Sequence, residues 1–514
     1  MLSGCTKISK SDKNLIVITS DGEIPVVTQT AVERYVPSRS FGVVPKTPIP
    51  LETESATVTE FEDRQEAEYQ GLAGLKLSDE IDGYSGYGYA TGFKERSKLN
   101  FSVNAPVDGH YNITVAFYGL KSDAKGQVIV NNIVVGDFTP TAPNKYLTAT
   151  FFEIYLESGF NDIIIMSLNG DMNIDYIEVT DSALTEIKNI TPTLSNPNAS
   201  TEAKDLMKYL CDNYGKKVIT GQYVSSEKNL ELDLLKKETT QYPAIRFGDM
   251  GEYTFKTDCK EVESALDWAL GGGGIVGEMW YWVNPAEAGT PYTSDFKLAN
   301  AVTDTDISQY TSDEIEALYA ENKISKEAYL IISDIDIISE KMYKFRDNNV
   351  PVLWRPLHEA SGDWFWWGAD KDAYLWLWNL MYKRMTEYHK LNNLIWIWNG
   401  QSKNFIVPSN QYDIGSADIY LRNETEFSSR SVLFKWLNRT TSQQKLLAVS
   451  ECGDLPNIND MFRDNAVWSF FGLWYGEYIS TDGYTLSPAY NSLEEFNAVY
   501  NSEKSITLYD YVNR

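Results

Sequence analysis

The sequence predicts two folded domains: an α/β domain of the (β/α)8, or TIM barrel, type, preceded by an all-β sandwich of the jelly-roll type. Three observations predict this. Helical patterns alternate with short apolar runs from residue 201 to residue 514. Short β-rich runs with frequent turns fill residues 59–182. Residues 183–200 are rich in Thr, Asn, Ser and Pro, which is typical of a linker between domains.

The barrel prediction depends on a set of apolar strand candidates that are separated by helical patterns. The strand candidates are Lys217–Gly221, Ala244–Phe247, Ile275–Trp280, Val350–Trp354, Leu394–Trp398, Ile414–Tyr420, Leu446–Ser450 and Val467–Trp474. The helix candidates are Glu202–Tyr214, Cys259–Leu270, Ile332–Asn348, Asp372–Lys390 and Val432–Asn438. An open doubly wound sheet is the alternative, but no Gly-x-Gly-x-x-Gly motif follows a strand to support a nucleotide-binding fold. The glycine run 271–274 predicts a tight helix-to-strand turn.

The sandwich prediction depends on alternating or β-rich runs punctuated by turns such as Asp108-Gly109 and Asn169-Gly170. The runs are Lys98–Val103, Tyr111–Phe117, Gln127–Val134, Thr148–Leu156, Asp162–Met166 and Ile174–Val179. Several short strands with frequent turns indicate a sandwich rather than a helical domain.

Composition and charge limit the classes of function. The chain has 514 residues, of which 43% are hydrophobic, so a sizeable core is possible. A net charge of -27 argues against nucleic acid and against anionic membrane surfaces as partners. No run of 18 apolar residues exists, so no transmembrane helix is expected. We expect a monomer with a neutral or cationic partner.

Residues 1–58 are proline-rich and predict an extended tether. The chain starts Met1-Leu-Ser-Gly-Cys5, and Leu-Ser-Gly-Cys resembles the cleavage box of a bacterial lipoprotein signal, although the apolar stretch of such a signal is missing. A chance match of four residues is the alternative. The resemblance implies a secreted bacterial lipoprotein, at the outer-membrane surface or in the periplasm, that is anchored through a lipid on Cys5.

Cysteine and histidine contents argue against a catalytic metal. The four cysteines, Cys5, Cys211, Cys259 and Cys452, match no zinc spacing, and the chain has only three histidines. Pairing of Cys211 with Cys259 is left open by the sequence. We expect no cofactor for catalysis.

The chemistry is concentrated in residues 351–368. An apolar run is followed at once by Arg355, His358 and Glu359, and then by Trp364, Trp366 and Trp367. Aromatic faces beside a carboxyl group are typical of a site that binds and cleaves sugars. Packing between helices and strands is the alternative explanation for Trp366, as it is for Trp376, Trp378 and Trp396.

Cleavage of a glycosidic bond usually needs two carboxyl groups, and in a barrel they should follow different strands. Glu359 follows the fourth strand candidate and Glu451 ends the seventh, 92 residues later (451 − 359). A single glutamate after a strand is more often part of a salt bridge or a helix cap. The pair and its aromatic neighbours favour a catalytic interpretation.

The stretch Arg355-Pro-Leu-His-Glu-Ala-Ser-Gly-Asp-Trp-Phe-Trp-Trp-Gly368 resembles the signature of glycoside hydrolase family 26, whose members are retaining (β/α)8 enzymes. Weaker likenesses extend over residues 201–514, at 217–222, 396–399, 418–420 and 467–474. The resemblance implies that Glu359 is the acid/base, with a raised pKa, and that Glu451 is the ionised nucleophile. It also implies that His358 lies beside the donor, that Tyr420 lies near the nucleophile, and that Trp364, Trp367 and Trp474 line the cleft. We expect Arg355 to orient a carboxylate.

One position departs from this family pattern. The third strand of the family commonly carries Trp-His-Trp before Asn-Pro, whereas this chain has Trp280-Tyr281-Trp282 before Asn284-Pro285. Tyr281 therefore stands near the sugar-binding cleft in place of a histidine, and its phenol does not ionise near neutral pH. The leading hypothesis is cleavage of β-1,4-mannosidic bonds in mannan, galactomannan or glucomannan. The alternatives are a hydrolase of xylan or mixed-linkage glucan, and a non-catalytic surface glycan-binding lipoprotein.

The β-rich region has a likeness of its own. Residues 61–68, 83–89, 109–113 and 173–177 resemble carbohydrate-binding modules of families 35 and 6. The resemblance implies a structural Ca²⁺ held by Glu66, Glu68 and Asp175, and hard oxygen donors suit that ion. The alternative is that these acids are solvated strand residues. Aromatic side chains between Tyr84 and Tyr89 are candidates either for contact with sugar or for packing on the sandwich rim.

Overall fold

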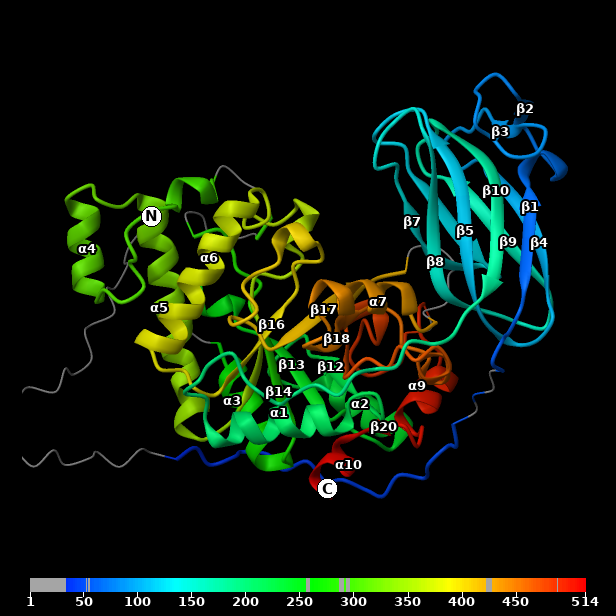
Figure 1. Ribbon diagram of the computed structural model, residues 1–514. Helices are drawn as coiled ribbons and strands as arrows, with labels where there is room; N and C mark the ends of the chain where they lie inside the picture. Colours follow the sequence, from blue (N-terminus) through cyan, green and yellow to red (C-terminus); the bar gives the residue numbers. More distant parts are fainter. Residues whose placement is uncertain are drawn as a thin grey trace, which may run out of the picture. The chain divides into compact units, whose positions relative to one another are not determined.

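The computed structural model of the protein is drawn in Figure 1. It describes residues 34–51, 53, 56–255, 259–285, 291–292, 296–421, 428–487 and 489–514. The expected lipidation site, Cys5, lies outside the described residues. No helix in the described part of the chain is both long enough and apolar enough to cross a membrane.

The N-terminal domain is a sandwich of two antiparallel sheets, as predicted. One sheet has the order β2 (Lys76–Ser78), β3 (Tyr89–Thr91), β10 (Met172–Asp181), β5 (Gly109–Gly119) and β8 (Tyr146–Leu156), with β1 (Glu62–Glu66) also paired to β10. The other has the order β4 (Lys98–Ala105), β9 (Gly159–Ser167), β6 (Gly126–Val130) and β7 (Ile133–Phe138). Strand β4 alternates strictly between exposed and buried residues, so Leu99, Phe101 and Val103 enter the core.

One predicted strand of the sandwich is two strands. The run 127–134 contains the turn between β6 and β7, because Asn131 and Asn132 both adopt positive φ angles, of 47° and 69°. Two consecutive residues of that conformation make the tight hairpin turn that matches the twist of antiparallel strands. Asparagine tolerates it better than most residues do, and the β-branched neighbours on both sides concealed the turn in the sequence.

The C-terminal domain is a closed barrel of parallel strands, which confirms the predicted fold class (Figure 1). The strands in order are β12 (Gly221–Tyr223), β13 (Ile245–Asp249), β14 (Ile275–Met279), β15 (Val352–Arg355), β16 (Leu394–Trp398), β17 (Ile414–Ile419), β18 (Leu446–Cys452) and β19 (Phe471–Leu473). All residues of β15, β16 and β18 are buried, as expected for strands covered by helices on one side and by the barrel core on the other.

The first barrel strand differs from the predicted one. Residues 217–221 divide into β11 (Val218–Ile219), which pairs with β20 (Ser505–Ile506), and the start of β12. Thr220 separates the two, because both its backbone N–H and its hydroxyl donate to the carbonyl of Ile506. Gly221 then enters the barrel, where a Cβ would lie 2.4 Å from the carbonyl oxygen of Phe471.

Helices cover the barrel between successive strands. They are α1 (Thr201–Asn213), α2 (Leu230–Thr239), α3 (Glu261–Leu266), α4 (Ser312–Ala320), α5 (Lys326–Asp347), α6 (Lys371–Lys383), α7 (Ser431–Thr440), α8 (Ile458–Arg463), α9 (Leu493–Tyr500) and α10 (Leu508–Val512). The sequence did not predict α2, α4, α8, α9 or α10. Helix α5 begins six residues before its predicted start, because Ser325 caps it by accepting a hydrogen bond from the Ala328 N–H.

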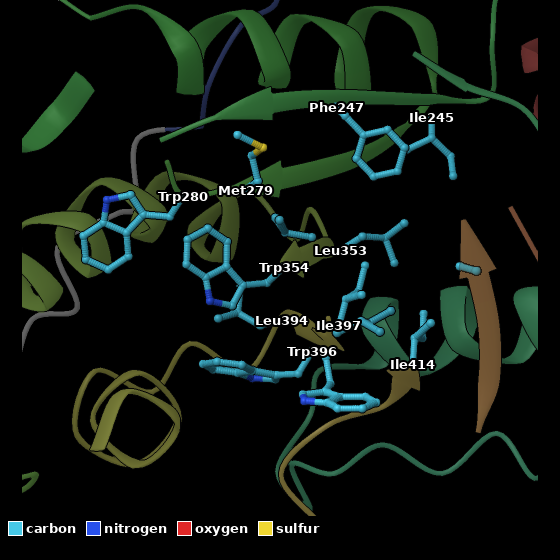
Figure 2. Close-up of a cluster of buried hydrophobic side chains, with 14 of the residues drawn as sticks. Ile245, Phe247, Met279, Trp280, Leu353, Trp354, Leu394, Trp396, Ile397 and Ile414 are labelled. Carbon is cyan, nitrogen blue, oxygen red and sulfur yellow. The ribbon is translucent and has the colours of Figure 1, made fainter. Parts of the chain in front are cut away.

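Large apolar side chains fill the barrel and its helix layer. Figure 2 shows part of this cluster, including Phe247, Met279, Trp354 and Trp396. Of the tryptophans for which packing was an open explanation, Trp366, Trp378 and Trp396 are at most 1% exposed. Burial of each such side chain stabilises the fold by roughly 1.5–3 kcal/mol. These side chains therefore stabilise the barrel that positions the ends of the strands.

An extended segment, residues 35–51, lies against the barrel. The Phe41 N–H donates to the carbonyl of Gly271, the Lys46 ammonium binds Asp510 at 2.9 Å, and Ile49 exchanges backbone hydrogen bonds with the 501–503 turn. This part of the predicted tether is therefore attached to the barrel. Gly271, in the four-glycine turn before β14, allows the contact, since a Cβ there would meet the carbonyl oxygen of Arg39. The thiols of Cys211, Cys259 and Cys452 are free, so no Cys211–Cys259 disulfide exists in this structure.

Candidate active site

Of the two candidate catalytic glutamates, Glu359 follows the fourth barrel strand, β15, and Glu451 lies in the seventh, β18. Glu359 comes after the turn that ends β15, and its backbone adopts a positive φ of 50°. That strained conformation is held by Asn399, whose carbonyl and side-chain oxygens both accept the Glu359 N–H, at 2.8 and 2.9 Å. The carboxyl of Glu359 is thus aimed by β15 and by the residue that follows β16.

Glu451 lies within β18 and is bound on both carboxylate oxygens. The Tyr420 hydroxyl donates to Oε1 at 2.6 Å, and Nη2 of Arg355 donates to Oε2. Nη1 of Arg355 donates to Asp418 at 2.7 Å. Arg355 therefore orients carboxylates, as expected, and it joins β15 to β17 and β18 in one buried network.

Asp418 is the buried counter-ion of this network, and no role was predicted for it. It accepts hydrogen bonds from Arg355, from the Ser450 hydroxyl at 2.7 Å and from the Asn399 amide at 3.0 Å. Asn399 holds Glu359 and Arg355 holds Glu451, so Asp418 fixes the supports of both candidate catalytic glutamates. The sequence signal was a carboxylate inside a buried apolar strand, but its partners come from other strands.

The environments of the two glutamates separate their protonation behaviour. Burial, reinforced by the charges of Asp418 and Glu451, raises the pKa of Glu359 to about 8. Burial also raises the pKa of Glu451, to about 7, while the Arg355 charge and the Tyr420 hydroxyl both favour its ionised form and oppose the rise. The Arg355 charge and the Tyr420 hydroxyl thus favour ionisation of Glu451, as expected for a nucleophile. The rise at Glu451 was not expected, because its full desolvation cannot be read from sequence.

Both glutamates line an open cavity of about 1200 Å³ at the carboxyl ends of the strands. Its walls are rich in aromatic and polar groups: Tyr281, Tyr292, His358, Trp364, Phe365, Gln401, Asp418, Tyr420, Leu421, Asp454, Trp474, Tyr478, Ala489 and Tyr490. Aromatic faces with a few convergent polar groups are suited to binding a sugar chain. This cavity is the candidate active site.

Four of the predicted cleft residues, Trp364, Tyr420, Trp474 and Tyr281, line this cavity, but Trp367 does not. Trp364 is 44% exposed, and its Nε1 donates to Glu359 Oε2 at 3.1 Å. Trp367 is fully buried, and its Nε1 donates to the carbonyl of His358. Trp367 therefore does not line the cavity in this structure, contrary to the expectation. Trp367 packs under the site and fixes the backbone of His358.

His358 forms part of the cavity wall beside Glu359. Burial, with the nearby Arg355 charge as the second cause, lowers the pKa of His358 well below its usual value, so the imidazole is neutral. Its ring packs edge-on against Phe365 at 4.8 Å and lies 6.3 Å from that of Tyr281. A neutral imidazole can donate a hydrogen bond to a sugar hydroxyl and add no charge beside Glu359.

Tyr281, at the position of the expected histidine, is held by its backbone. Its N–H donates to Oδ1 of Asp249, the last residue of β13, at 2.8 Å. Its ring packs edge-on against Phe365 at 5.7 Å and against Tyr292 at 6.2 Å. The phenol thus belongs to an aromatic wall next to Glu359.

Several wall residues were missed by the sequence reasoning. Gln401 donates through Nε2 to Glu359 Oε1 at 3.3 Å. Three more residues of the cavity wall come after β18 in the chain: Asp454, Tyr478 and Tyr490. They stand in irregular segments with no motif, so only the fold brings them to the cavity.

The three acids predicted to bind calcium lie close together in the sandwich. The Ser85 hydroxyl donates to Glu66 at 2.7 Å, the Tyr87 N–H donates to Glu68 at 2.7 Å, and the Ser85 N–H donates to both Asp175 oxygens. The second carboxylate oxygens of Glu66 and Glu68 are buried without a hydrogen-bond partner. Even so, no group of three or more His, Cys, Asp or Glu forms a metal site within the described ranges.

Comparison with known proteins gives two family matches. The sequence model of glycosyl hydrolase family 26 matches residues 195–508, and that of carbohydrate binding module family 35 matches residues 63–182. The second match agrees with the predicted likeness to families 35 and 6.

Relatives of similar length carry the same activity in their names. A mannan endo-1,4-β-mannosidase of Thermothelomyces thermophilus is 32% identical over 86% of this chain and 89% of its own. A Podospora anserina β-(1,4)-mannanase of families 26 and 35 is similar in structure, with a TM-score of 0.58 and 30% identity over 87% of this chain and 98% of its own. A ruminal family 26 endo-β-1,4-mannanase has a TM-score of 0.66 and 26% identity over 88% of this chain and 99% of its own.

Proposed function

The chain belongs to glycosyl hydrolase family 26, and on that premise we propose that it is an endo-acting mannanase, which cleaves β-1,4-mannosidic bonds inside mannan, galactomannan or glucomannan. The single observation that carries the proposal is the pair Glu359 and Glu451, on the fourth and seventh strands in one cavity. The surroundings of Glu451 favour its ionised form through Arg355 and Tyr420, as a nucleophile requires, whereas burial and nearby negative charges favour the protonated form of Glu359, as a proton donor requires.

The proposed mechanism is a double displacement with retention. The Glu451 carboxylate attacks the anomeric carbon while Glu359 gives its proton to the glycosidic oxygen, so the C–O bond breaks and the leaving sugar chain departs. Glu359, now ionised, takes a proton from water, which attacks the same carbon and releases Glu451. Arg355 and Tyr420 hold Glu451 in place for both displacements, and Trp364 and Gln401 hold Glu359. No cofactor takes part.

Product analysis on a panel of mannans, xylans and β-glucans tests the proposal. We expect the protein to release mannose oligomers with retained anomeric configuration, as seen by proton NMR at early times. Glu359→Gln and Glu451→Ala should lose hydrolysis and still bind mannan oligosaccharides. Activity on xylan or β-glucan with none on mannan would contradict the substrate. Full turnover by both variants would contradict the site.

Tyr281 is the position that keeps the choice of glycan open. A tyrosine is larger than a histidine and reaches further into the cavity, so it changes the hydroxyl pattern that fits beside Glu359. We expect Tyr281→His to change the ratio of the activities on mannan and glucomannan. This change should be smaller than the loss of activity caused by Glu359→Gln. The tyrosine phenol lies in the wall and does not hold either catalytic carboxylate.

For the sandwich we propose a sugar-binding accessory role and a structural Ca²⁺. The two buried, unpartnered oxygens of Glu66 and Glu68 support the ion, because such oxygens are costly to bury without a cation or a hydrogen-bond donor. Asp175 would contribute through its charge, since its oxygens already accept the Ser85 N–H. Binding of the glycan panel by the double variant Glu359→Gln/Glu451→Ala measures binding without turnover, and the part of that binding that is lost on removal of Ca²⁺ is assigned to the sandwich.

We propose finally that Cys5 carries a lipid and anchors the protein to a bacterial membrane. The support is the Leu-Ser-Gly-Cys box alone. Metabolic labelling of the protein in bacterial cells with an alkyne fatty acid tests it. The label should appear in the unmodified protein and disappear in Cys5→Ala, and a label that persists in Cys5→Ala would exclude this anchor.

A further inference from the structure

Asp454 is a carboxylate in the cavity wall that the proposed mechanism does not use. It lies three residues after Glu451, in the turn that ends β18. It lines the catalytic cavity together with Tyr478 and Tyr490, and it also borders a neighbouring depression of about 510 Å³. Both hollows share Asp454 and Tyr490, so these two side chains stand where the cleft continues beyond the catalytic pair.

The backbone around Asp454 is clamped on both sides by one buried amide. Asn491, 2% exposed, donates to the carbonyl of Gly453 at 3.0 Å and accepts the Leu455 N–H at 2.7 Å. The same amide donates to the carbonyl of Tyr478 at 2.9 Å. Asn491 therefore fixes Asp454 and Tyr478 relative to each other. A site that is held by buried hydrogen bonds is preorganised for a ligand.

The side chain of Asp454 keeps hydrogen-bonding capacity. Within the described residues it accepts one hydrogen bond, a long one of 3.4 Å from the Leu421 N–H to Oδ2. A carboxylate can accept as many as four hydrogen bonds. Two neighbouring hydroxyls of a sugar ring can donate to its two oxygens, and such charge-assisted bonds are stronger than neutral ones.

Aromatic rings lead from the nucleophile to this carboxylate. Tyr420, which binds Glu451, packs edge-on against Tyr478 at 5.3 Å, and Tyr478 lies 4.6 Å from Tyr490. Gly453 permits this closeness, because a Cβ there would lie 2.6 Å from the ring of Tyr478 and 2.8 Å from that of Tyr420. Tyr490 is 39% exposed, so an apolar face remains available at the rim.

From this arrangement we propose that Asp454, Tyr478 and Tyr490 form a further sugar subsite, which binds a hexopyranose unit of the substrate away from the bond that is cleaved. The inference rests on the proposed glycan hydrolase function. The carboxylate accepts hydroxyls of the unit, and a tyrosine face covers its apolar side. Binding energy from such a remote unit is used at the reacting bond, so substrates that cannot reach the subsite are cleaved more slowly.

The test compares Asp454→Asn with the unmodified protein on linear β-1,4-mannooligosaccharides of three to six units. We expect kcat/KM of the variant to be unchanged on the shortest substrate that is cleaved and to fall about tenfold on the longest, because the amide nitrogen of Asn cannot accept a hydroxyl as the second carboxylate oxygen does. The control is Glu477→Gln. Glu477 is exposed, stands next to Tyr478 and does not line the cavity, so this variant removes the same charge with no length dependence.

The outcomes separate a subsite from other roles. A loss of the same factor at every length, or no loss at any length, would overturn the proposal. A loss seen on galactomannan as well as on long linear substrates supports the subsite, whereas a loss on galactomannan alone would overturn it in favour of a contact with a branch sugar. Thermal unfolding of Asp454→Asn should coincide with that of the unmodified protein.

Failure of the proposed mannanase function would give a different result, because the unmodified protein would then cleave none of the mannooligosaccharides. The same comparison of lengths is then made with xylan or glucan oligosaccharides. If the unmodified protein cleaves none of these, calorimetric titration with the hexasaccharides replaces kinetics. In that case equal affinity of Asp454→Asn and the unmodified protein overturns the subsite, and weaker affinity of the variant supports it.

Discussion

The hydroxyl of Tyr420 donates a hydrogen bond of 2.6 Å to Oε1 of Glu451, the oxygen that Arg355 leaves free. This bond favours the ionised carboxylate and lowers its pKa against the effect of burial. The tyrosine itself remains protonated, because burial and the Glu451 charge raise the pKa of Tyr420 far above its usual value. Tyr420 is therefore a permanent donor to the nucleophile.

Tyr420→Phe should raise the pKa of Glu451 and move the acidic limb of the pH profile to higher pH. Hydrogen bonds to charged groups contribute about 1.5–3 kcal/mol, so we expect kcat/KM to fall roughly 10- to 150-fold near neutral pH. Less of the loss should appear at pH 9, where Glu451 is ionised in either protein. A profile that falls by the same factor at every pH would contradict this electrostatic role.

Glu359→Gln should remove the alkaline limb of the pH profile. In the unmodified protein the donor must be protonated, so kcat/KM should decrease as the pH rises through about 8, the pKa to which burial raises Glu359. The variant cannot lose that proton and should retain a flat, low rate, roughly 10²- to 10⁴-fold reduced. The measurement is kcat/KM between pH 5 and 10 on an oligosaccharide. An alkaline limb that persists in the variant would assign the titration to another group.

Much of this site could be predicted because its key residues are local to strands. Glu359 and Glu451 each follow an apolar run of the kind that becomes a fully buried barrel strand, and the closed barrel brings such strand ends together. Counting the strand candidates along the chain assigned Glu359 to the fourth strand and Glu451 to the seventh. That inference needed only the apolar pattern and the direction of parallel strands.

The remaining residues depend on contacts that no local pattern encodes. Asp418 becomes a counter-ion only because Arg355, 63 residues earlier, faces it across the barrel. Trp364 and Trp367 stand three residues apart in one aromatic cluster, but Trp364 lines the cavity and Trp367 packs under His358. The position of Asp454 is fixed by Asn491, in a segment without any motif.

Arg355→Leu should destabilise the fold strongly. It leaves the buried carboxylates of Asp418 and Glu451 without their shared cation, and such losses cost about 3–5 kcal/mol. Denaturant unfolding should show a smaller loss at pH 5 than at pH 8, since both carboxyls can then take up protons. The double variant Arg355→Leu/Asp418→Asn is the matched control and should recover part of the loss. Equal losses at both pH values would show that packing, not charge, is responsible.

Glu278, on the outer side of β14, should limit stability at alkaline pH. It is fully buried, and neither carboxyl oxygen accepts a hydrogen bond within the described residues. Its ion pair with Arg246 is long, at 3.7 Å, and the same guanidinium binds Glu261 at 3.0 Å. Burial, and then the Glu261 charge, raise the pKa of Glu278 well above 4.5. Because the raised value belongs to the folded state, its stabilising effect is complete below pH 4.5 and is lost as the pH rises towards the folded pKa.

Glu278→Gln should therefore unfold at a higher denaturant concentration than the unmodified protein at pH 9, with little difference at pH 5. The amide keeps the shape of the protonated carboxyl and cannot ionise. Glu263→Gln is a suitable control, since Glu263 lies in α3 but pairs at the surface with Lys344. A variant that is less stable than the unmodified protein at both pH values would show that Glu278 is ionised and useful in the fold.

Calcium removal should affect the sandwich more than the barrel. If Glu66 and Glu68 bind the ion, saturation at about 100 times the dissociation constant adds about 2.7 kcal/mol to the stability of the folded sandwich. A chelator should then lower the midpoint of the sandwich transition in calorimetry and leave hydrolysis of short oligosaccharides unchanged. Glu66→Gln/Glu68→Gln should show no calcium response, whereas Glu62→Gln, on the same strand as Glu66 but exposed, should respond like the unmodified protein.

An unchanged midpoint after chelation of the unmodified protein would exclude calcium from the carboxylates of Glu66 and Glu68. Such a result would leave the hydrolase assignment untouched.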